Sequence, residues 1–435
     1  MTRNTLWMAG LGWLAAAVAL SQHEGHDAAA MAATSPPPDE QAARGRNLFQ
    51  SDMALMTGMV PEDPMGGMAM PGWHVMDLGV ARITFNGQGG PSGRKSGESE
   101  NWNMLHVGHD LGTGRLSLMM MNSLEAATFP KGGSQELFQT GETYSGRALV
   151  DRQHPHDFFM NLSATYRQQL GDHSAFWLQL APVGEPALGP TTYMHRASAG
   201  ENPAAPLGHH WEDSTHITYD VVTVGGGWRA VSLEGSVFHG AEPDENRWNI
   251  QSGPLDSVSG RLRLRFAGGW SGQVSYGFLK HPEATEPGDL HRTTASIHYG
   301  ADGDRPLAFT LLWGRNDEES GASNGWLAEG AWQLTRADQV FGRVEYVQKD
   351  YALLASKGRP QTPVPGQPRL ADVFALTAGY LRDFMVVEPL KTGVGADVTV
   401  YSFPSSLKPV YGDFPVSGHF FVRLRWGSPH AGHSM

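Results

Sequence analysis

Cysteine is absent from this chain of 435 residues. Disulfide frameworks and thiolate chemistry are therefore excluded. After residue 20 no apolar run approaches the ~20 residues that a spanning helix needs, which excludes a helical membrane topology. Positive charge is also scarce, with 32 lysines and arginines against 44 aspartates and glutamates. The net charge of −12 argues against nucleic acid as a partner, because phosphate recognition needs a positive surface.

Catalytic signatures are equally scarce. The chain contains no glycine-rich phosphate loop and no Gly-x-Ser-x-Gly nucleophile elbow. We therefore expect a protein that is not an enzyme. The alternative is a lipid-active barrel enzyme with Ser214 and His216 on one face of a strand in the outer wall, because residues two apart share a face.

The N-terminus is typical of an export signal. Arg3 precedes an apolar run over 6–20, and small residues follow at Ala19-Leu20-Ser21. We expect a signal peptide over 1–21, cleaved after Ser21. A retained membrane anchor is the alternative, although the run is shorter than the ~20 residues of a spanning helix. An exported chain without disulfides needs another source of stability, and a closed strand barrel supplies one.

Residues 22–72 differ in composition from the rest of the chain. They contain Ser35-Pro36-Pro37-Pro38, many alanines and a methionine-rich stretch, and they lack strand alternation. This composition predicts a disordered periplasmic extension. The predicted barrel domain follows over 73–427, and a periplasmic tail over 428–435 ends the chain.

Alternation of apolar and polar residues is the main structural signal. Residues 261–266 read Arg-Leu-Arg-Leu-Arg-Phe, so a strand places the arginines on one face and the apolar residues on the other. Such a strand fits either a soluble sandwich or a transmembrane barrel with a wet lumen. Similar segments occur sixteen times, near 73–86, 101–112, 113–125, 157–171, 173–183, 214–227, 229–240, 256–267, 269–280, 291–300, 305–315, 324–335, 338–349, 371–383, 388–402 and 417–427.

The connections between these segments favour the barrel. Long ones are expected near 87–100, 126–156, 184–213, 241–255, 281–290, 316–323, 350–370 and 403–416, and they alternate with short turns such as Gly112-Thr113-Gly114. Outer-membrane barrels have short periplasmic turns and long external loops, whereas a sandwich has no reason to place every long loop at one end. The fold class is therefore an all-β, antiparallel up-and-down transmembrane barrel of about sixteen strands, with twelve to sixteen possible.

The last strand agrees with this fold. Phe420, Val422, Leu424 and Trp426 fall on one face, with His419, Arg423 and Arg425 on the other. The terminal aromatic is similar to the assembly signal of outer-membrane barrels. The tail beyond it departs from that pattern.

The methionine-rich stretch predicts a soft-metal site. Thioethers select Cu(I), while imidazole and carboxylate suit Cu(II), Ni(II) or Zn(II). A low-complexity or gap-filling role for the methionines is the alternative. No cofactor is required. Copper is the candidate metal, and its expected ligands are Met53, Met56, Met59, Met65, Met68, Met70, His74 and Met76, with His23 and His26 after the cleavage site and His430 and His433 at the other end.

Two resemblances bear on this reading. The segment Met65-Gly-Gly-Met-Ala-Met70 resembles methionine motifs of periplasmic copper-handling proteins, and a Met/His-rich segment before a barrel resembles copper-resistance protein B type proteins. The long connections carry polar stretches such as Asp151-Arg-Gln-His-Pro-His-Asp157 and His209-His-Trp-Glu-Asp213, and these resemble loops of a porin-like group of Gram-negative outer-membrane β-barrels whose function is not established. Both resemblances imply location in the cell outer membrane, and the first implies copper handling.

The long connections carry dense polar stretches. They suggest either a metal or anion site at the mouth or a network that locks folded loops to the wall. We favour the network. The candidate residues are Asp151, His154, His156, Asp157, Glu185, His195, Arg196, His209, His210, Asp213, His216 and His239.

The inward register of the strands predicts a charged lumen. Arginine rings bias a pore toward anions, whereas full pairing with acids would close it. The expected pore-lining residues are Arg261, Arg263, Arg265, Arg343, Glu345, Arg423 and Arg425, opposed by Asp220, Glu329 and Asp397.

We therefore expect an outer-membrane porin-like channel or transport protein, linked to copper or another soft metal through its N-terminal segment. A metal-sequestering protein anchored by its barrel is the alternative. The expected partners are outer-membrane lipid and a small solute or metal ion. Porin-like barrels of this size are often trimers, so a homotrimer is one expected assembly.

Overall fold

The computed structural model describes residues 72–284, 288–301, 305–358, 364–387 and 390–427. All of them belong to one compact unit, Asn47–Met435. Within these ranges no helix has both the length and the apolar character needed to cross a membrane.

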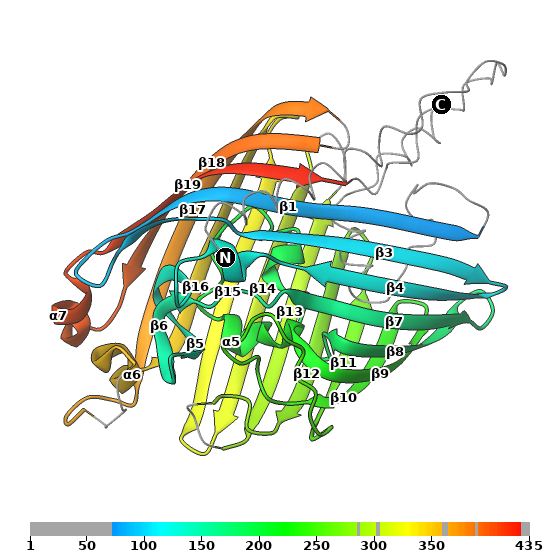
Figure 1. Cartoon of the computed structure of the whole chain (residues 1–435), viewed down its shortest axis with the longest axis horizontal. Helices are drawn as coiled ribbons and strands as arrows, with labels where there is room; N and C mark the ends of the chain where they lie inside the picture. The colour runs from blue at the N-terminus through cyan, green and yellow to red at the C-terminus, as the bar shows by residue number, and fades with distance from the viewer. Residues whose placement is uncertain (1–71, 285–287, 302–304, 359–363, 388–389, 428–435) are drawn as a thin grey trace. The chain divides into compact units, whose positions relative to one another are not determined.

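Sixteen antiparallel strands form a closed barrel (Figure 1). Each strand pairs with its neighbours along the chain, as the alternating pattern of 73–427 predicts. The strands are β1 (Trp73–Gln88), β2 (Lys95–Glu98) with β3 (Asn101–Leu111), β4 (Gly114–Asn122), β7 (Phe159–Gln169), β8 (Ser174–Gly184), β9 (Thr218–Trp228), β10 (Val231–His239), β11 (Ser257–Arg265), β12 (Trp270–Leu279), β13 (Leu290–Ala301), β14 (Leu307–Glu318), β15 (Gly321–Gln333), β16 (Asp338–Asp350), β17 (Leu370–Val387), β18 (Leu390–Ser402) and β19 (Val416–Trp426).

The first and last strands close the barrel. β1 pairs with β19 from Gly79 opposite Trp426 to Gln88 opposite Ser417. The other edge of β1 pairs with both β2 and β3, so these two short elements form one barrel strand with a break between them. Closure leaves no free sheet edge, as a hydrocarbon environment requires.

The strands present one polar and one apolar face. In β10 every second residue is buried inside and the intervening ones are exposed outside, Leu233 at 63%. Exposed aromatic residues lie near both ends of the outer face, as expected for side chains at the membrane interfaces. They are Trp228, Trp270, Trp332 and Tyr380 toward the short turns, and Tyr276, Trp326 and Phe374 toward the long connections.

The sequence-based strand positions are confirmed, all sixteen of them. The expected long connection over 316–323 is wrong, because β14 continues to Glu318 and β15 begins at Gly321. The connection over 126–156 contains a hairpin of its own, made by β5 (Ser134–Tyr144) and β6 (Arg147–Gln153). Short helices lie in four of the long connections: α4 (Glu125–Thr128) before the hairpin, η1 (Tyr193–His195), α5 (His209–Glu212) and η2 (Ser214–His216) between β8 and β9, α6 (Tyr351–Ser356) between β16 and β17, and η3 (Ser405–Leu407) and α7 (Lys408–Tyr411) between β18 and β19.

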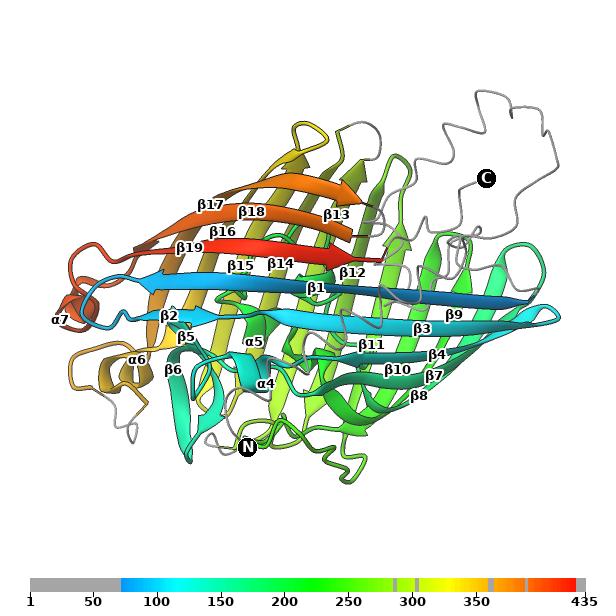
Figure 2. The same ribbon diagram turned by 45° about the horizontal axis from the view of Figure 1, so that its top comes forward.

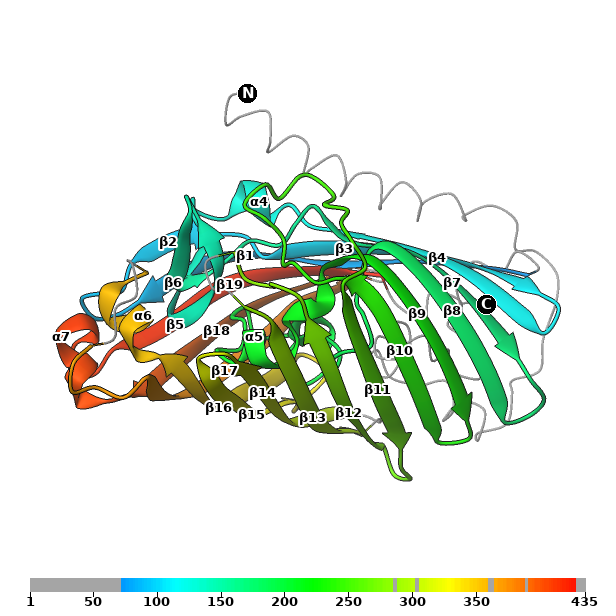
Figure 3. The same ribbon diagram turned by 90° about the horizontal axis from the view of Figure 1, so that it is seen from below.

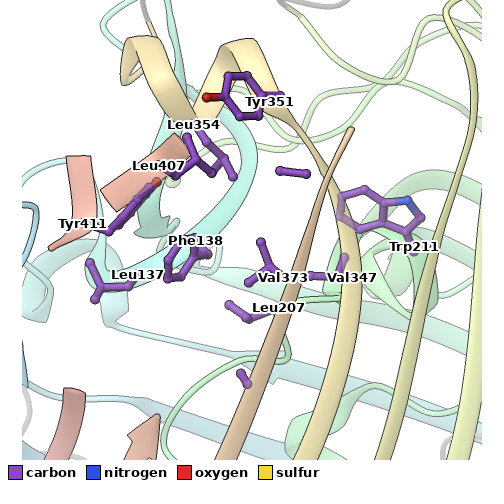
Figure 4. Close-up of a cluster of buried hydrophobic side chains, with 12 residues drawn as sticks. Leu137, Phe138, Leu207, Trp211, Val347, Tyr351, Leu354, Val373, Leu407 and Tyr411 are labelled. Carbon is purple, nitrogen blue, oxygen red and sulfur yellow. The ribbon is translucent and has the colours of Figure 1, made fainter. Parts of the chain in front are cut away.

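An apolar cluster joins several long connections at one side of the external mouth (Figure 4). Phe138 of β5 is fully buried and stacks on Tyr411 of α7, with ring centroids 4.1 Å apart. Leu354 of α6 and Leu207 belong to the same cluster. These connections are thus folded against one another and against β16 and β17, as their composition predicts.

Candidate functional site

The connection between β8 and β9, residues 185–217, lies inside the barrel, and we call it the lumenal segment. Its helix α5 is drawn within the outline of the barrel in every view (Figures 1, 2 and 3). It contacts β13, β14 and β15. The connection expected near 184–213 therefore enters the lumen.

Polar groups of the inner wall hold the start of the lumenal segment. A buried backbone needs a partner for each N–H and C=O group. The N–H of Ala187 donates to Ser236 Oγ at 2.7 Å, and that of Gly189 donates to Ser275 Oγ at 2.8 Å. Gly189 has a φ of 82°, and a Cβ there would lie 2.6 Å from the carbonyl oxygen of Glu212. Only glycine fits this turn.

Ion pairs attach the middle of the segment to the wall. Arg196 is about 1% exposed and lies 2.6 Å from both Asp213 Oδ2 and Glu329 Oε1. Glu201 lies 2.6 Å from Arg423 and 2.9 Å from Arg425. Unpaired charges at this depth would be costly, so these pairs hold the segment in one position.

The predicted pore-lining residues also find partners. Arg261 and Arg263 both contact Glu234, and Arg343 contacts Glu329 at 2.9 Å. Glu345 accepts a hydrogen bond from Leu207 N of the lumenal segment. Arg265 and Arg425 are more accessible: Arg265 is exposed, and the Arg425 side chain is 24% exposed.

Asp220 was predicted to oppose the lumenal arginines, but it faces an external connection instead. Its carboxylate accepts hydrogen bonds from Ser252 and Gly253 of the β10–β11 connection. Its φ is 53°, so the alternation of β9 is disturbed at this residue. Asp397 instead pairs with His419 at 2.8 Å. Neither acid contacts one of the predicted arginines.

Five histidines gather where the lumenal segment meets the external connections, and we call them the histidine cluster: His154, His156, His209, His210 and His216. All are less than a tenth exposed. Ring centroids lie 5.3 Å apart for His209 and His216, 5.3 Å for His156 and His216, 5.4 Å for His209 and His210, and 5.7 Å for His154 and His210.

Three of these rings are oriented through Nδ1. His156 Nδ1 lies 2.6 Å from Glu125 Oε2, and His209 Nδ1 lies 2.6 Å from Asp213 Oδ1. His216 Nδ1 lies 3.1 Å from the carbonyl oxygen of Asp213. The Nε2 atoms of all three are buried and have no hydrogen-bond partner among the described residues. A ring fixed at one nitrogen with the other free has the orientation that metal-binding histidines need.

A second chain of contacts orients His154. Its Nε2 lies 3.1 Å from Glu142 Oε1. Glu142 pairs in turn with Arg247, which also contacts Asp157 at 3.2 Å. The Tyr219 hydroxyl donates to Asp157. Burial raises the pKa of Glu142 to about 8 although Arg247 opposes this.

Burial also keeps most of the cluster neutral. It lowers the pKa of His154 well below the usual value, and neighbouring Arg247 adds to the effect. It does the same for His216, with His209 adding to it. The pKa of His209 is lowered by burial despite the Asp213 carboxylate. At pH 7 these rings are therefore neutral nitrogen donors rather than cations.

His210 is different because two carboxylates face it. Burial opposes a charge on its ring, but Glu242 and Glu283 outweigh burial and raise the pKa of His210 to about 10. Burial raises the pKa of Glu242, but His210 outweighs burial and lowers it to about 2. Burial and the charge of Glu242 raise the pKa of Glu283. The raised pKa favours the protonated ring of His210 at neutral pH, facing both carboxylates.

Four of the predicted loop residues lie elsewhere. Asp151 pairs with Lys357 and accepts from Phe138 N, and Glu185 pairs with Arg261. His195 packs against Trp102 with the two rings tilted and their centroids 4.5 Å apart. His239 contacts the carbonyl oxygen of Pro254. The polar stretches therefore split into several separate networks.

Three members of this site, Glu125, Glu142 and Arg247, were not predicted from the sequence. Glu125 and Glu142 lie 17 residues apart in the β4–β7 connection and Arg247 lies in the β10–β11 connection, so no local motif links them. The signal that could have found them is indirect. A buried histidine needs an acceptor, and the acids of the other long connections were the available ones.

The enzyme alternative placed Ser214 and His216 on the outer wall of a strand, and this placement is wrong. Both residues belong to η2, before β9 begins. Ser214 Oγ lies 3.4 Å from Glu242 Oε1 and accepts from Arg292, while His216 Nδ1 faces the Asp213 carbonyl oxygen. These contacts do not form the expected dyad.

The predicted copper ligands up to Met70, together with His430 and His433, lie outside the described residues, and His74 is described only as part of β1. Met76 is buried on the inner side of β1 in an apolar cluster with four further methionines that the sequence analysis missed: Met104, Met119, Met121 and Met160. Methionine fills irregular gaps in such cores.

A closed barrel with an even number of antiparallel strands, an apolar outer belt and a polar interior defines an outer-membrane β-barrel protein. No protein-family model matches the chain, and no curated protein sequence is similar to it. The resemblance to copper-resistance protein B type proteins gains no support from these comparisons.

Solved structures of outer-membrane proteins are similar to the chain. OprB of Pseudomonas putida has 10% identity, covers 82% of this chain and 94% of its own, and gives a TM-score of 0.48. OmpT of Vibrio cholerae has 10% identity, covers 82% and 99%, and gives 0.46. The channel DcaP of Acinetobacter baumannii has 10% identity, covers 84% and 100%, and gives 0.44.

Proposed function

We propose that the protein is an outer-membrane channel for small hydrophilic solutes whose width is set by the lumenal segment. The observation that carries this proposal is the position of that segment across the interior of a sixteen-stranded barrel. A barrel of this size encloses a lumen wide enough for water and solutes unless something fills it. A segment folded inside then determines the diameter and the charge of the path.

The attachment of the segment supports a restricted channel rather than a wide one. It contacts β10 and β12 through Ala187 and Gly189, β15 through Arg196 and β19 through Glu201. Inward side chains at these levels are buried, such as Arg261 at 4% exposed. The wall therefore faces protein at these levels, and solute flow requires part of the segment to move or to leave only a narrow path.

Planar-bilayer conductance of the refolded full chain tests the proposal. We expect stepwise openings of low open probability in the wild type. Glu201→Gln weakens the attachment and should raise that probability. Absence of steps from both proteins, each folded by circular dichroism and by heat-modifiable gel mobility, would show that the barrel is not a channel.

As a second candidate function, we propose soft-metal handling by the N-terminal extension. The observation that favours it is the motif Met65-Gly-Gly-Met-Ala-Met70, since thioethers prefer Cu(I). Copper(I) titration of the full chain tests it against a variant with leucine at the six methionines from Met53 to Met70. Equal Cu(I) affinity of the two proteins would contradict this function.

A further inference from the structure

Three side chains from three separate connections converge at the edge of the histidine cluster. His210 comes from α5 of the lumenal segment, Glu242 from the β10–β11 connection and Glu283 from the β12–β13 connection. His210 Nδ1 lies 3.4 Å from Glu242 Oε1 and 3.3 Å from Glu283 Oε1. One ligand atom of each residue lies within 4.8 Å of the other two.

These separations match the spacing of ligands around a small divalent ion. Zinc binds nitrogen and carboxylate oxygen at about 2.0–2.2 Å in a tetrahedron, so its ligand atoms lie roughly 3.3–3.5 Å from one another. Both distances from His210 already fall in this range. The two carboxylates belong to different connections, and a small rotation of either side chain adjusts the third separation.

The free nitrogen of a buried ring is an independent observation at the same place. His210 is 5% exposed, and neither of its ring nitrogens has a hydrogen bond of normal geometry among the described residues. Its Nε2 packs against Gly141, where a Cβ would lie only 2.1 Å away. Packing thus directs Nδ1 toward the two carboxylates, where a ligand is expected.

The surroundings favour a cation at this point. Two glutamates held this close repel each other unless a positive charge lies between them. Arg292 hydrogen-bonds Ser214, which donates to Glu242, and acts on the two glutamates electrostatically without a direct ion pair to either of these described side chains. Arg247 is already shared by Glu142 and Asp157. A divalent ion would satisfy both carboxylates and the ring nitrogen together.

We propose that His210, Glu242 and Glu283 form a binding site for a divalent transition-metal ion of the Zn²⁺ type at the external mouth, with water as the fourth ligand. Imidazole nitrogen disfavours Mg²⁺ and Ca²⁺, which prefer oxygen ligands only, and the absence of thioethers disfavours Cu(I). The ion would join the lumenal segment to two external connections. This site requires neither the channel nor the methionine-rich extension.

Zinc titration of the metal-free full chain in detergent tests the site. We expect Glu242→Gln and His210→Asn each to lose one equivalent of bound Zn²⁺, with affinity at that site reduced at least about a hundredfold. The matched controls are the exposed residues Glu319 and His173, and Glu319→Gln and His173→Asn should keep every equivalent. Equal stoichiometry and affinity in all five proteins would overturn the proposal.

Zinc-edge X-ray absorption of the wild type, loaded with one equivalent, covers the case in which a ligand variant does not fold. We expect one imidazole and oxygen ligands around the ion. A first shell of several imidazoles would place the ion among His156, His209 and His216 or in the histidine-rich termini, and a shell containing sulfur would place it in the methionine-rich extension. Either result would overturn the proposal. A first shell of oxygen alone would overturn it as well.

Discussion

Replacing Glu201 by glutamine should loosen the lumenal segment from the barrel wall. Glu201 is 2% exposed and is held by Arg423 at 2.6 Å and by Arg425 at 2.9 Å. Burial would raise the pKa of Glu201, but the two arginines outweigh burial and lower it from 4.5 to about 2. That difference corresponds to about 3 kcal/mol in favour of the ionised, attached carboxylate.

The same magnitude follows from the chemistry of the pair. Removing one partner of a buried ion pair costs about 3–5 kcal/mol, because the remaining charge is left without compensation. Arg423 keeps Asp383 as a second partner, so the lower end of the range applies. A penalty of about 3 kcal/mol on the attached position changes its equilibrium with a detached one by roughly a hundredfold.

Single-channel recording in planar bilayers measures this change. We expect the open probability of the Glu201→Gln protein to rise by roughly a hundredfold while it is small, and the single-step conductance to rise less. Glu319→Gln removes an exposed glutamate from the turn between β14 and β15 and should change neither quantity. An unchanged open probability in a folded Glu201→Gln protein would refute the role of this pair as the attachment.

Three further predictions follow from the same geometry. Acidification should open the wild-type channel. The arginines paired with Glu201 and Asp213 lower the pKa values of these acids against burial, so the ion pairs stabilise the attached segment above about pH 4.5 and lose this effect as pH falls toward 2. The open probability in recordings should rise over that range. Phe138→Ala should destabilise the external apolar cluster by about 3–5 kcal/mol, measured as faster proteolysis of the β5–β6 hairpin with the barrel intact. Arg167 of β7 is close enough to Arg115 and Arg265 for their charges to act on it, so this group should attract anions into the channel. Arg167→Gln should lower the anion-over-cation preference in reversal-potential measurements by about 0.4 kcal/mol, roughly twofold.

The fold could be predicted from the sequence because its signal is local. Alternation in a segment such as 261–266 depends only on which face of one strand meets lipid. The alternation of long and short connections then orders the strands without any long-range information. The expected connection over 316–323 was wrong because β14 and β15 continue as paired strands through a polar stretch, up to Glu318 and from Gly321, where polar residues do not mark the end of a strand.

The candidate site could be predicted only in part. His154, His156 and the histidines of the lumenal segment stand in conspicuous polar stretches, and the structure brings five of them together. Their acidic partners do not follow from the sequence, because Glu125 and Glu142 are far apart within the β4–β7 connection and Glu283 comes from the β12–β13 connection. Pairing of this kind is decided by how loops fold over the mouth, which no local pattern encodes.

The distribution of attachments limits how the lumenal segment can move. Its start is bound to β10 and β12 through backbone groups, and its end contacts β13, β14 and β15 through α5. A rigid-body movement of the whole segment would break all of these contacts at once. Glu201 stands between the two ends, and the pairs with Arg423 and Arg425 are its contacts to the opposite side of the wall. Opening is therefore expected as a local movement of the part around Glu201, with α5 and the histidine cluster left in place.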